Sequence, residues 1–202
     1  MAQVAEAEYI LKMATLTYYY GPMYAGKSTM ALQMDHMLGI DGGSSGVLVT
    51  AGGRNVTGLE SRLGLAKDAY VADPDTDLFE LVKGRTQTLF VIVDEAQFLT
   101  PTQIESLARV VDELGIDVFA FGLKADFTGH LFPGSARLLE LSDAERELPL
   151  PVLCWCGCRG RFNARVVNGV VAAGGPQVAI EDGTVSYRVL CRRHFLARQL
   201  HE

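Results

Sequence analysis

Residues 14–28 of the chain, ATLTYYYGPMYAGKS, decide its fold. The run of Thr, Leu and Tyr at 14–20 predicts a strand, and residues 28–38 predict a helix that ends before Gly39. Between them, residues 21–28 have the spacing G-x-x-x-x-G-K-S. Glycines at this spacing let backbone N–H groups converge on phosphates, and the following helix adds its positive end. The alternative is a glycine-rich turn arising by chance, but the strand before it and the helix after it favour a phosphate site.

This loop predicts roles for two side chains. Lys27 would contact the β- and γ-phosphate oxygens of ATP, and the Ser28 hydroxyl would coordinate Mg²⁺. Together with the acid described next, the predicted nucleotide-binding residues are Gly21, Pro22, Met23, Tyr24, Ala25, Gly26, Lys27, Ser28, Thr29 and Asp94.

Two acids follow the most apolar run of the chain, within TLFVIVDEAQF at 88–98. Such a run is typical of a central strand covered on both faces, so Asp94 and Glu95 should emerge at the carboxyl edge of the sheet, where open α/β folds bind ligands. Neighbouring side chains of a strand point in opposite directions. We therefore expect Asp94 to order Mg²⁺ through water and Glu95 to accept a proton from an attacking hydroxyl. The alternative is that one of these acids caps the next helix.

The other elements alternate between strand and helix. Residues 46–51 and 117–123 predict buried strands, whereas 75–84 and 101–114 predict helices. Residues 52–66 contain four glycines and no sustained period, which predicts a long flexible loop. Alternating strands and helices indicate an α/β fold of the P-loop NTPase type, with a mostly parallel sheet and flanking helices.

The amino-acid composition changes near residue 150, where prolines and cysteines appear. We therefore predict an ATP-binding α/β domain at 1–149 and a small second domain at 150–202. With 202 residues, 49% of them hydrophobic, the chain can build a core without disulfides.

The formal charge of −6 argues against a protein that coats nucleic acid or an anionic membrane. The sequence has no apolar run long enough to span a bilayer, and its N-terminus lacks the basic start of a secretory signal. These patterns predict a cytoplasmic protein.

The four cysteines lie at 154, 156, 158 and 191, which favours a metal site over a disulfide framework. A structural Zn²⁺ takes four thiolate or imidazole ligands, usually two from each of two segments. Cys191 and His194 form the second pair, with two residues between them. The first segment offers three thiols for two places. The alternative is four reduced cysteines that bind no metal.

Taken together, the P-loop, the DEAQF segment at 94–98, GLKADFTGHLFPGS at 122–135 and CRRH at 191–194 resemble the type II thymidine kinases. The resemblance runs from about residue 15 to 196. It implies a P-loop α/β domain joined to a zinc-binding lasso domain. It also implies transfer of the γ-phosphate of ATP to the 5′-hydroxyl of thymidine, and of deoxyuridine as well, in nucleotide salvage for DNA synthesis.

The resemblance also implies roles for individual residues. Glu95 matches the catalytic base of the family. The residues that match its substrate contacts are Arg62, Gln97, Phe98, Phe127, Arg165 and Tyr187. Phe98 and Phe127 would face the thymine ring and Tyr187 the deoxyribose and base, whereas core packing is the alternative for each aromatic.

For the metal, Phe162 matches a family aromatic, and counting back from it selects Cys156 as a ligand with Cys154 as its partner. The predicted zinc ligands are Cys154, Cys156, Cys191 and His194. The competing first pair is Cys154 with Cys158.

Two segments depart from the family pattern. Gly53 stands where an acid is expected near Arg54 and Arg62, and the lid at 180–183 is one residue longer than usual. Both differences concern substrate contacts and leave nucleoside selectivity open. The resemblance further implies a homo-oligomer, commonly a tetramer, and leaves open inhibition by the triphosphate end product.

Two other classes of function compete with this interpretation. A regulatory or motor P-loop NTPase would hydrolyse ATP without a nucleoside. A zinc-ribbon nucleic-acid binder would need a basic surface, and the arginines of the C-terminal segment are accompanied there by Glu181 and Asp182. We expect thymidine and ATP as partners, and neither nucleic acid nor membrane.

Overall fold

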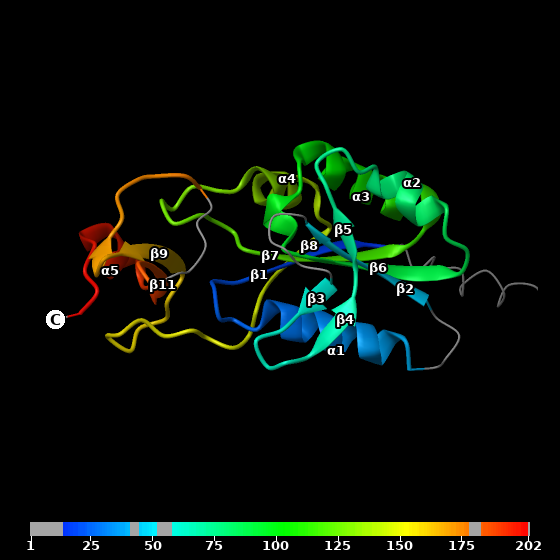
Figure 1. Cartoon of the computed structure of the whole chain (residues 1–202). Coiled ribbons are helices and arrows are strands. Elements are labelled where there is room, and N and C mark those ends of the chain that lie inside the picture. Colours follow the sequence, from blue (N-terminus) through cyan, green and yellow to red (C-terminus); the bar gives the residue numbers. More distant parts are fainter. Residues whose placement is uncertain (1–13, 41–44, 52–57, 178–182, 202) are drawn as a thin grey trace, which may run out of the picture.

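The computed structural model describes residues 14–40, 45–51, 58–177 and 183–201 (Figure 1). Six strands form one parallel sheet in the order β5-β2-β6-β7-β1-β8. Their bounds are β1 Leu16–Tyr20, β2 Ser45–Ala51, β5 Tyr70–Ala72, β6 Thr88–Asp94, β7 Asp117–Gly122 and β8 Ala144–Glu147. The α/β architecture predicted from the sequence is confirmed, and β5 and β8 are additional edge strands that the sequence patterns did not reveal.

Helices cover both faces of this sheet. The helices are α1 Lys27–Leu38, α2 Leu78–Lys83, α3 Pro101–Leu114 and α4 Pro133–Leu141, with a 3₁₀ turn, η1, at Ala96–Phe98. Helices α2, α3 and α4 lie on one face, and α1 lies on the other (Figure 1). Alternate residues of β6 serve the two faces: Val91 and Val93 pack in the core beneath α2 and α3, whereas Phe90 and Ile92 pack toward α1. Burial on both faces explains the uninterrupted apolar run of this strand.

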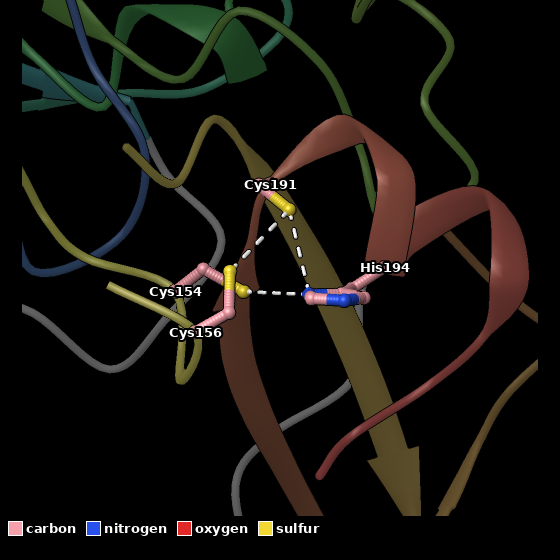
Figure 2. Close-up of side chains that lie close together, drawn as sticks. All are labelled: Cys154, Cys156, Cys191 and His194. Carbon is pink, nitrogen blue, oxygen red and sulfur yellow. Dashed lines mark hydrogen bonds between the residues drawn. The ribbon is translucent and has the colours of Figure 1, made fainter. Parts of the chain in front are cut away.

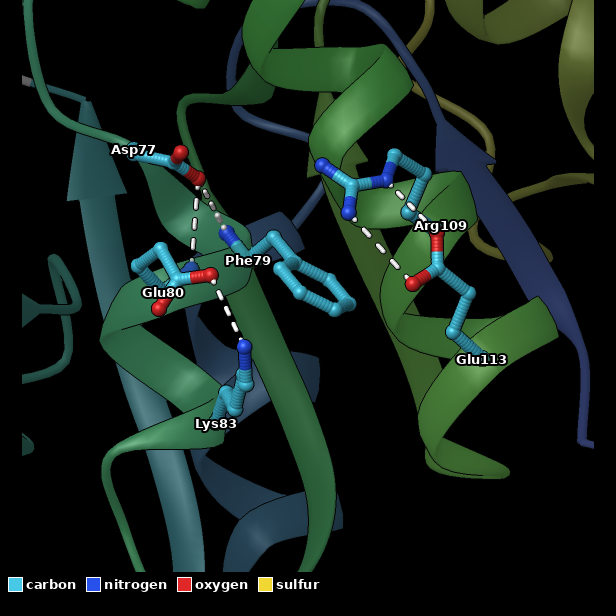
Figure 3. A network of polar contacts seen from close by, with 6 residues as sticks. All are labelled: Asp77, Phe79, Glu80, Lys83, Arg109 and Glu113. Carbon is cyan, nitrogen blue, oxygen red and sulfur yellow. Dashed lines mark hydrogen bonds and ion pairs between the residues drawn. The ribbon is translucent and has the colours of Figure 1, made fainter.

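Local capping fixes the ends of α2 and α3. The Asp77 carboxylate accepts hydrogen bonds from the backbone N–H groups of Phe79 and Glu80 at the start of α2 (Figure 3). Thr100 and Gln103 form a capping box at the start of α3, within the bounds predicted from the sequence. The Arg109 guanidinium of α3 lies 4.0 Å from the centre of the Phe79 ring, so the two helices pack through a cation–π contact.

The predicted loop at 52–66 is wrong over its described part. Residues 58–60 form β3 (Gly58–Glu60), which pairs with β4 (Ala66–Asp68) in an antiparallel hairpin beside α1 (Figure 1). Burial of Leu59 and an ion pair between Lys67 Nζ and Asp35 Oδ2, 2.6 Å apart, attach the hairpin to the helix. These tertiary contacts supply the order that the glycine-rich local sequence does not.

The residues after 150 build a separate three-stranded sheet, ordered β10-β9-β11, and a terminal helix. The bounds are β9 Phe162–Val167, β10 Val170–Val171, β11 Val185–Leu190 and α5 Arg192–Ala197. Both strand pairs are antiparallel, and α5 packs against β9 and β11. Within the described residues, no helix is long and apolar enough to cross a membrane.

Candidate active site

The phosphate loop joins β1 to α1 with a backbone suited to anion binding. Gly26, the residue before α1, has φ 82°, and Tyr24 has φ 67°. No side chain among the described residues caps the start of α1, so its first N–H groups are left for a bound anion. Uncapped N–H groups at a helix N-terminus form a binding site for phosphate.

Lys27 lies beneath this loop. Its ammonium group donates to the carbonyl oxygens of Pro22 at 2.9 Å and Gly21 at 3.3 Å. Burial lowers the pKa of Lys27, although the nearby carboxylates of Glu95 and Asp94 oppose this shift. The cation is therefore placed among the groups that would surround a polyphosphate.

Asp94 lies at the carboxyl end of β6, across β7 from the end of β1. Burial, and next the neighbouring Glu95, raise the pKa of Asp94 to about 6, while a hydrogen bond from Ser28 lowers it. Its Oδ1 atom is buried and makes no hydrogen bond with any residue that the structure describes. This carboxylate oxygen lies next to a P-loop hydroxyl and could accept a hydrogen bond from a water molecule bound to Mg²⁺. The residues present therefore fit a magnesium site.

Glu95 follows Asp94 with φ 53°, in the left-handed region that few non-glycine residues adopt. This backbone turn ends β6 and starts η1, and it leaves the Glu95 side chain partly exposed in the cleft. Its Oε2 atom accepts a hydrogen bond from the amide of Gln97. Strained backbone of this kind is concentrated at functional sites.

A cleft of about 560 Å³ unites these groups with aromatic side chains from distant segments. Phe98 and Phe132 form an edge-to-face pair with ring centres 5.5 Å apart, and Phe127 and Tyr187 contribute further aromatic surface. The cleft is lined by these predicted site residues: Met23, Tyr24, Gly26, Lys27, Ser28, Thr29, Arg62, Asp94, Glu95, Gln97, Phe98, Phe127 and Tyr187.

Arg165 is not among the side chains that line this cleft. It is buried, with its guanidinium carbon 3.6 Å from the centre of the Phe127 ring. Its Nε atom donates to the Tyr187 hydroxyl at 3.1 Å, and another guanidinium nitrogen donates to the Gln177 carbonyl at 2.9 Å. Arg165 thus contacts Phe127 and Tyr187, which line the cleft, without lining the cleft itself.

Arg62 reaches the phosphate loop from the β3–β4 hairpin, with its guanidinium carbon 4.2 Å from the centre of the Tyr24 ring. The remaining predicted P-loop residues, Gly21, Pro22 and Ala25, shape the loop without lining the cleft. Gly53 and Arg54 lie outside the described residues, as do residues 180–182 of the predicted lid.

Asn163, Gln177 and Asp126 are polar cleft residues that the sequence analysis did not single out. The Asn163 side chain accepts a hydrogen bond from the Met23 N–H, and the Gln177 amide donates to Asp126 at 3.1 Å. Burial alone would raise the pKa of Asp126, but hydrogen bonds, first from Thr128 and Gln177, lower it overall. The two-residue spacing of Asn163 and Arg165 places both on one face of β9, but it does not by itself show that Asn163 contacts the phosphate loop.

A second cluster lies at the far end of the three-stranded sheet (Figure 2). The ligand atoms of Cys154, Cys156, Cys191 and His194 all lie within 4.8 Å of one another. Individual separations are 3.4 Å from Cys154 Sγ to His194 Nδ1, 3.5 Å from Cys191 Sγ to the same nitrogen, and 4.0 Å between the sulfurs of Cys156 and Cys191.

This donor set fits zinc. Tetrahedral Zn²⁺ with bonds of roughly 2.0–2.3 Å separates its ligand atoms by about 3.5–3.8 Å, close to the spacings found. Cys158, the competing ligand, is exposed, as Cys156 is, but among the described residues it is not part of the group of four whose ligand atoms lie together. The site connects the turn at 154–156 to the start of α5, and Trp155 stacks on the His194 ring with centres 4.2 Å apart.

Comparison with known proteins gives one consistent family. The family model described as thymidine kinase matches residues 14–195. The chain is 46% identical to the thymidine kinase of Streptomyces coelicolor, over 92% of this chain and 90% of that protein. It is 44% identical to the thymidine kinase of Cutibacterium acnes, with 90% and 88% covered, and 37% identical to that of Yersinia pseudotuberculosis, with 91% and 95% covered.

The matched residues include the phosphate loop, the two acids after β6, the aromatic walls of the cleft and the metal-ligand cluster. With a family match over most of the chain and relatives above 40% identity, the chain belongs to the thymidine kinase family.

Proposed function

We propose that this protein transfers the γ-phosphate of ATP to the 5′-hydroxyl of thymidine, and also of deoxyuridine, giving the nucleoside monophosphate and ADP. One observation carries the proposal: Glu95 lines the same cleft as Lys27 and Ser28 of the phosphate loop and as the aromatic side chains of Phe98, Phe127 and Tyr187. A carboxylate that shares a cleft with a phosphate-binding loop and with aromatic side chains suits phosphoryl transfer to a nucleoside hydroxyl.

The proposed step assigns the proton to Glu95. The 5′-oxygen forms a bond to the γ-phosphorus as the bond between that phosphorus and the β–γ bridging oxygen breaks, and its electron pair leaves with ADP. Glu95 accepts the hydroxyl proton. Lys27 and the loop N–H groups stabilise charge on the phosphate oxygens, and Arg62 is placed to assist them. Most of the rate enhancement would come from positioning and electrostatics.

The nucleoside would bind between the aromatic side chains. Phe127 and Phe98 offer faces to a pyrimidine ring, and Tyr187 closes the wall next to them. Because Arg165 contacts Phe127 and Tyr187 without lining the cleft itself, we propose that Arg165 acts on nucleoside affinity through these two aromatic side chains.

Two metals complete the proposal. Mg²⁺ would be held by Ser28 and, through water, by Asp94, and it would neutralise charge on the phosphate oxygens. Structural Zn²⁺ would be held by Cys154, Cys156, Cys191 and His194, which fastens the lasso domain at 150–202 beside the nucleoside. Removing zinc should then weaken thymidine binding and spare the six-stranded sheet.

The first experiment follows phosphate transfer from ATP to thymidine, beside deoxyuridine, deoxycytidine, deoxyadenosine and no acceptor. Glu95→Gln should lower kcat by roughly 10²- to 10⁴-fold. Glu113→Gln, which breaks an exposed ion pair on α3, is the matched control and should retain the wild-type rate. Thymidine-dependent product that disappears only in Glu95→Gln supports the proposal.

ATP consumption without any acceptor would instead indicate a regulatory NTPase. Salt-dependent binding to single-stranded DNA would indicate a nucleic-acid binder. Either result, together with no nucleoside phosphorylation, would overturn the proposal.

A cytoplasmic location and a homotetramer are further proposals, supported by the sequence patterns and the family resemblance. Light scattering of the purified protein measures the subunit number, and cell fractionation tests the location.

A further inference from the structure

We propose that Gln97 is a positioning residue that holds the carboxylate of Glu95 in the orientation needed for proton transfer. The family resemblance alone would make Gln97 a substrate contact. This inference rests on the proposed role of Glu95 as the base, and it adds the group that aims that base.

Both the oxygen and the nitrogen of the Gln97 side-chain amide form hydrogen bonds within the protein. Its Oε1 atom accepts a hydrogen bond of 2.9 Å from the backbone N–H of Leu123, and its Nε2 atom donates to Oε2 of Glu95. The Leu123 contact fixes which end of the amide is which, because only the oxygen can accept from an N–H group. The nitrogen is thereby directed at the carboxylate.

Leu123 is itself held firmly, so the anchor of the amide is rigid. Its carbonyl oxygen accepts hydrogen bonds from the Tyr18 hydroxyl at 2.8 Å and from the Ser135 hydroxyl at 2.6 Å. Tyr18 and Ser135 are fully buried. A series of hydrogen bonds therefore runs from β1 and α4 through Leu123 and Gln97 to Glu95.

The backbone comes close to Gln97 at two glycines. A Cβ atom at Gly122 would lie 2.8 Å from Gln97 Oε1, and one at Gly134 would lie 3.0 Å from the Gln97 carbonyl oxygen. Gln97 is 1% exposed although its side chain borders the cleft. The amide is therefore closely surrounded by protein.

Such a partner matters for Glu95 because its side chain is partly exposed in the cleft. A carboxylate in a polar cleft can rotate among several orientations, and an error of about 1 Å at the reacting group costs up to roughly a hundredfold in rate. A fixed donor on one carboxylate oxygen leaves the other oxygen for the substrate hydroxyl.

The test compares Gln97→Met and Gln97→Glu with the wild-type protein. Met keeps the size and removes both contacts, whereas Glu keeps an acceptor for Leu123 and removes the donor to Glu95. Gln103→Met is the matched control, because Gln103 is also buried and its amide also joins two backbone segments, but it does not line the cleft. For each variant we would measure kcat, KM for thymidine, KM for ATP and the midpoint of thermal unfolding.

We expect both Gln97 variants to lose about 10- to 100-fold in kcat, with both KM values within about twofold of wild type. Gln103→Met should lower the unfolding midpoint and keep kcat. A loss in Gln97→Glu that appears mainly as a higher KM for thymidine would overturn the inference and restore the substrate contact. Unchanged kcat in either Gln97 variant would also overturn it.

Glu95→Gln separates this inference from the proposed function. If Glu95→Gln keeps its turnover, both the base and its positioning residue are wrong. If Glu95→Gln is inactive and Gln97→Met is fully active, only the positioning role is wrong. In the Glu95→Gln background, adding Gln97→Met should cause no further loss in kcat, because the group being positioned is already absent.

Discussion

The backbone N–H of Met23 donates a hydrogen bond of 2.8 Å to Oδ1 of Asn163, which joins the phosphate loop to a strand 140 residues later in the chain. The loop conformation that binds ATP is therefore partly set by the three-stranded sheet. Asn163→Ala should raise KM for ATP about 5- to 10-fold, since one hydrogen bond contributes about 1 kcal/mol. Steady-state kinetics with each substrate varied in turn measures this effect.

Gln177→Ala is the control for Asn163→Ala, because it should affect the other substrate. Gln177 also lies beyond residue 150, but its amide contacts Asp126 next to Phe127. This variant should raise KM for thymidine and leave KM for ATP unchanged. If Asn163→Ala changes KM for thymidine alone, the proposed coupling to the phosphate loop is wrong.

Asp94 should make the ligand-free protein less stable as the pH rises. Its pKa is raised by burial from 3.8 to about 6, so between these values the folded state binds the proton more tightly than the unfolded chain does. The free energy of unfolding then falls across this pH window, by about 3 kcal/mol in total. Asp94→Asn should abolish this fall and, without Mg²⁺ or nucleotide, be more stable than wild type at about pH 8.

Urea unfolding at about pH 4 and pH 8 measures the difference, and the same variant should lose nearly all kinase activity. A stability gain at pH 4 as large as that at pH 8 would contradict the titration of Asp94 as its cause.

The metal site makes different predictions for two neighbouring cysteines. Cys156→Ser should lower bound zinc well below one atom per chain, because Cys156 belongs to the four-residue cluster. Cys158→Ser should keep the metal, because Cys158 is exposed outside that cluster. Elemental analysis of the purified variants distinguishes them, and equal loss in both would show that Cys158 is a ligand.

The ion pair between Lys67 and Asp35, which attaches the β3–β4 hairpin to α1, should contribute more to the free energy of unfolding than an exposed ion pair does. Asp35 has a buried side chain, so Lys67→Met leaves a buried carboxylate without its cation and should cost about 1–3 kcal/mol of stability. Lys83→Met is the control, because Lys83 and Glu80 are both exposed and such pairs contribute about 0–1 kcal/mol (Figure 3).

Adding Asp35→Asn to Lys67→Met should recover most of the lost stability, as measured by urea unfolding. If the double variant is no more stable than Lys67→Met, the hairpin is held by the burial of Leu59 instead.

Local sequence signals predicted the central part of the fold well. Pro101 and the capping residue Thr100 marked the start of α3 at the observed residue, and the apolar run before Asp94 marked β6. Caps and apolar runs of this kind depend on only a few neighbouring residues, so they can be recognised in the sequence. The parallel sheet was predicted from the alternation of strands and helices along the chain, because parallel strands need helical crossovers.

Other elements depend on tertiary contacts that no local pattern contains. Edge strand β8 has the polar sequence AERE, and it forms because its backbone pairs with β1 more than 120 residues earlier. In the site, the phosphate loop and the two acids were visible as motifs. The roles of Asn163 and Arg165 depend on how the second sheet lies against the cleft, so spacing alone could not assign them.

The pairing of β1 also determines when the phosphate loop can become ordered during synthesis. Leu16 pairs with Val118 of β7, and Thr17 pairs with Ala144 of β8, so β1 has no sheet neighbour until β7 exists and gains its second neighbour only with β8. Strands β2, β5 and β6 can pair earlier, because their partners are close in sequence. Contacts between residues so far apart form slowly and late in folding. The phosphate loop is therefore made well before the strands that pair with β1 and hold it in place.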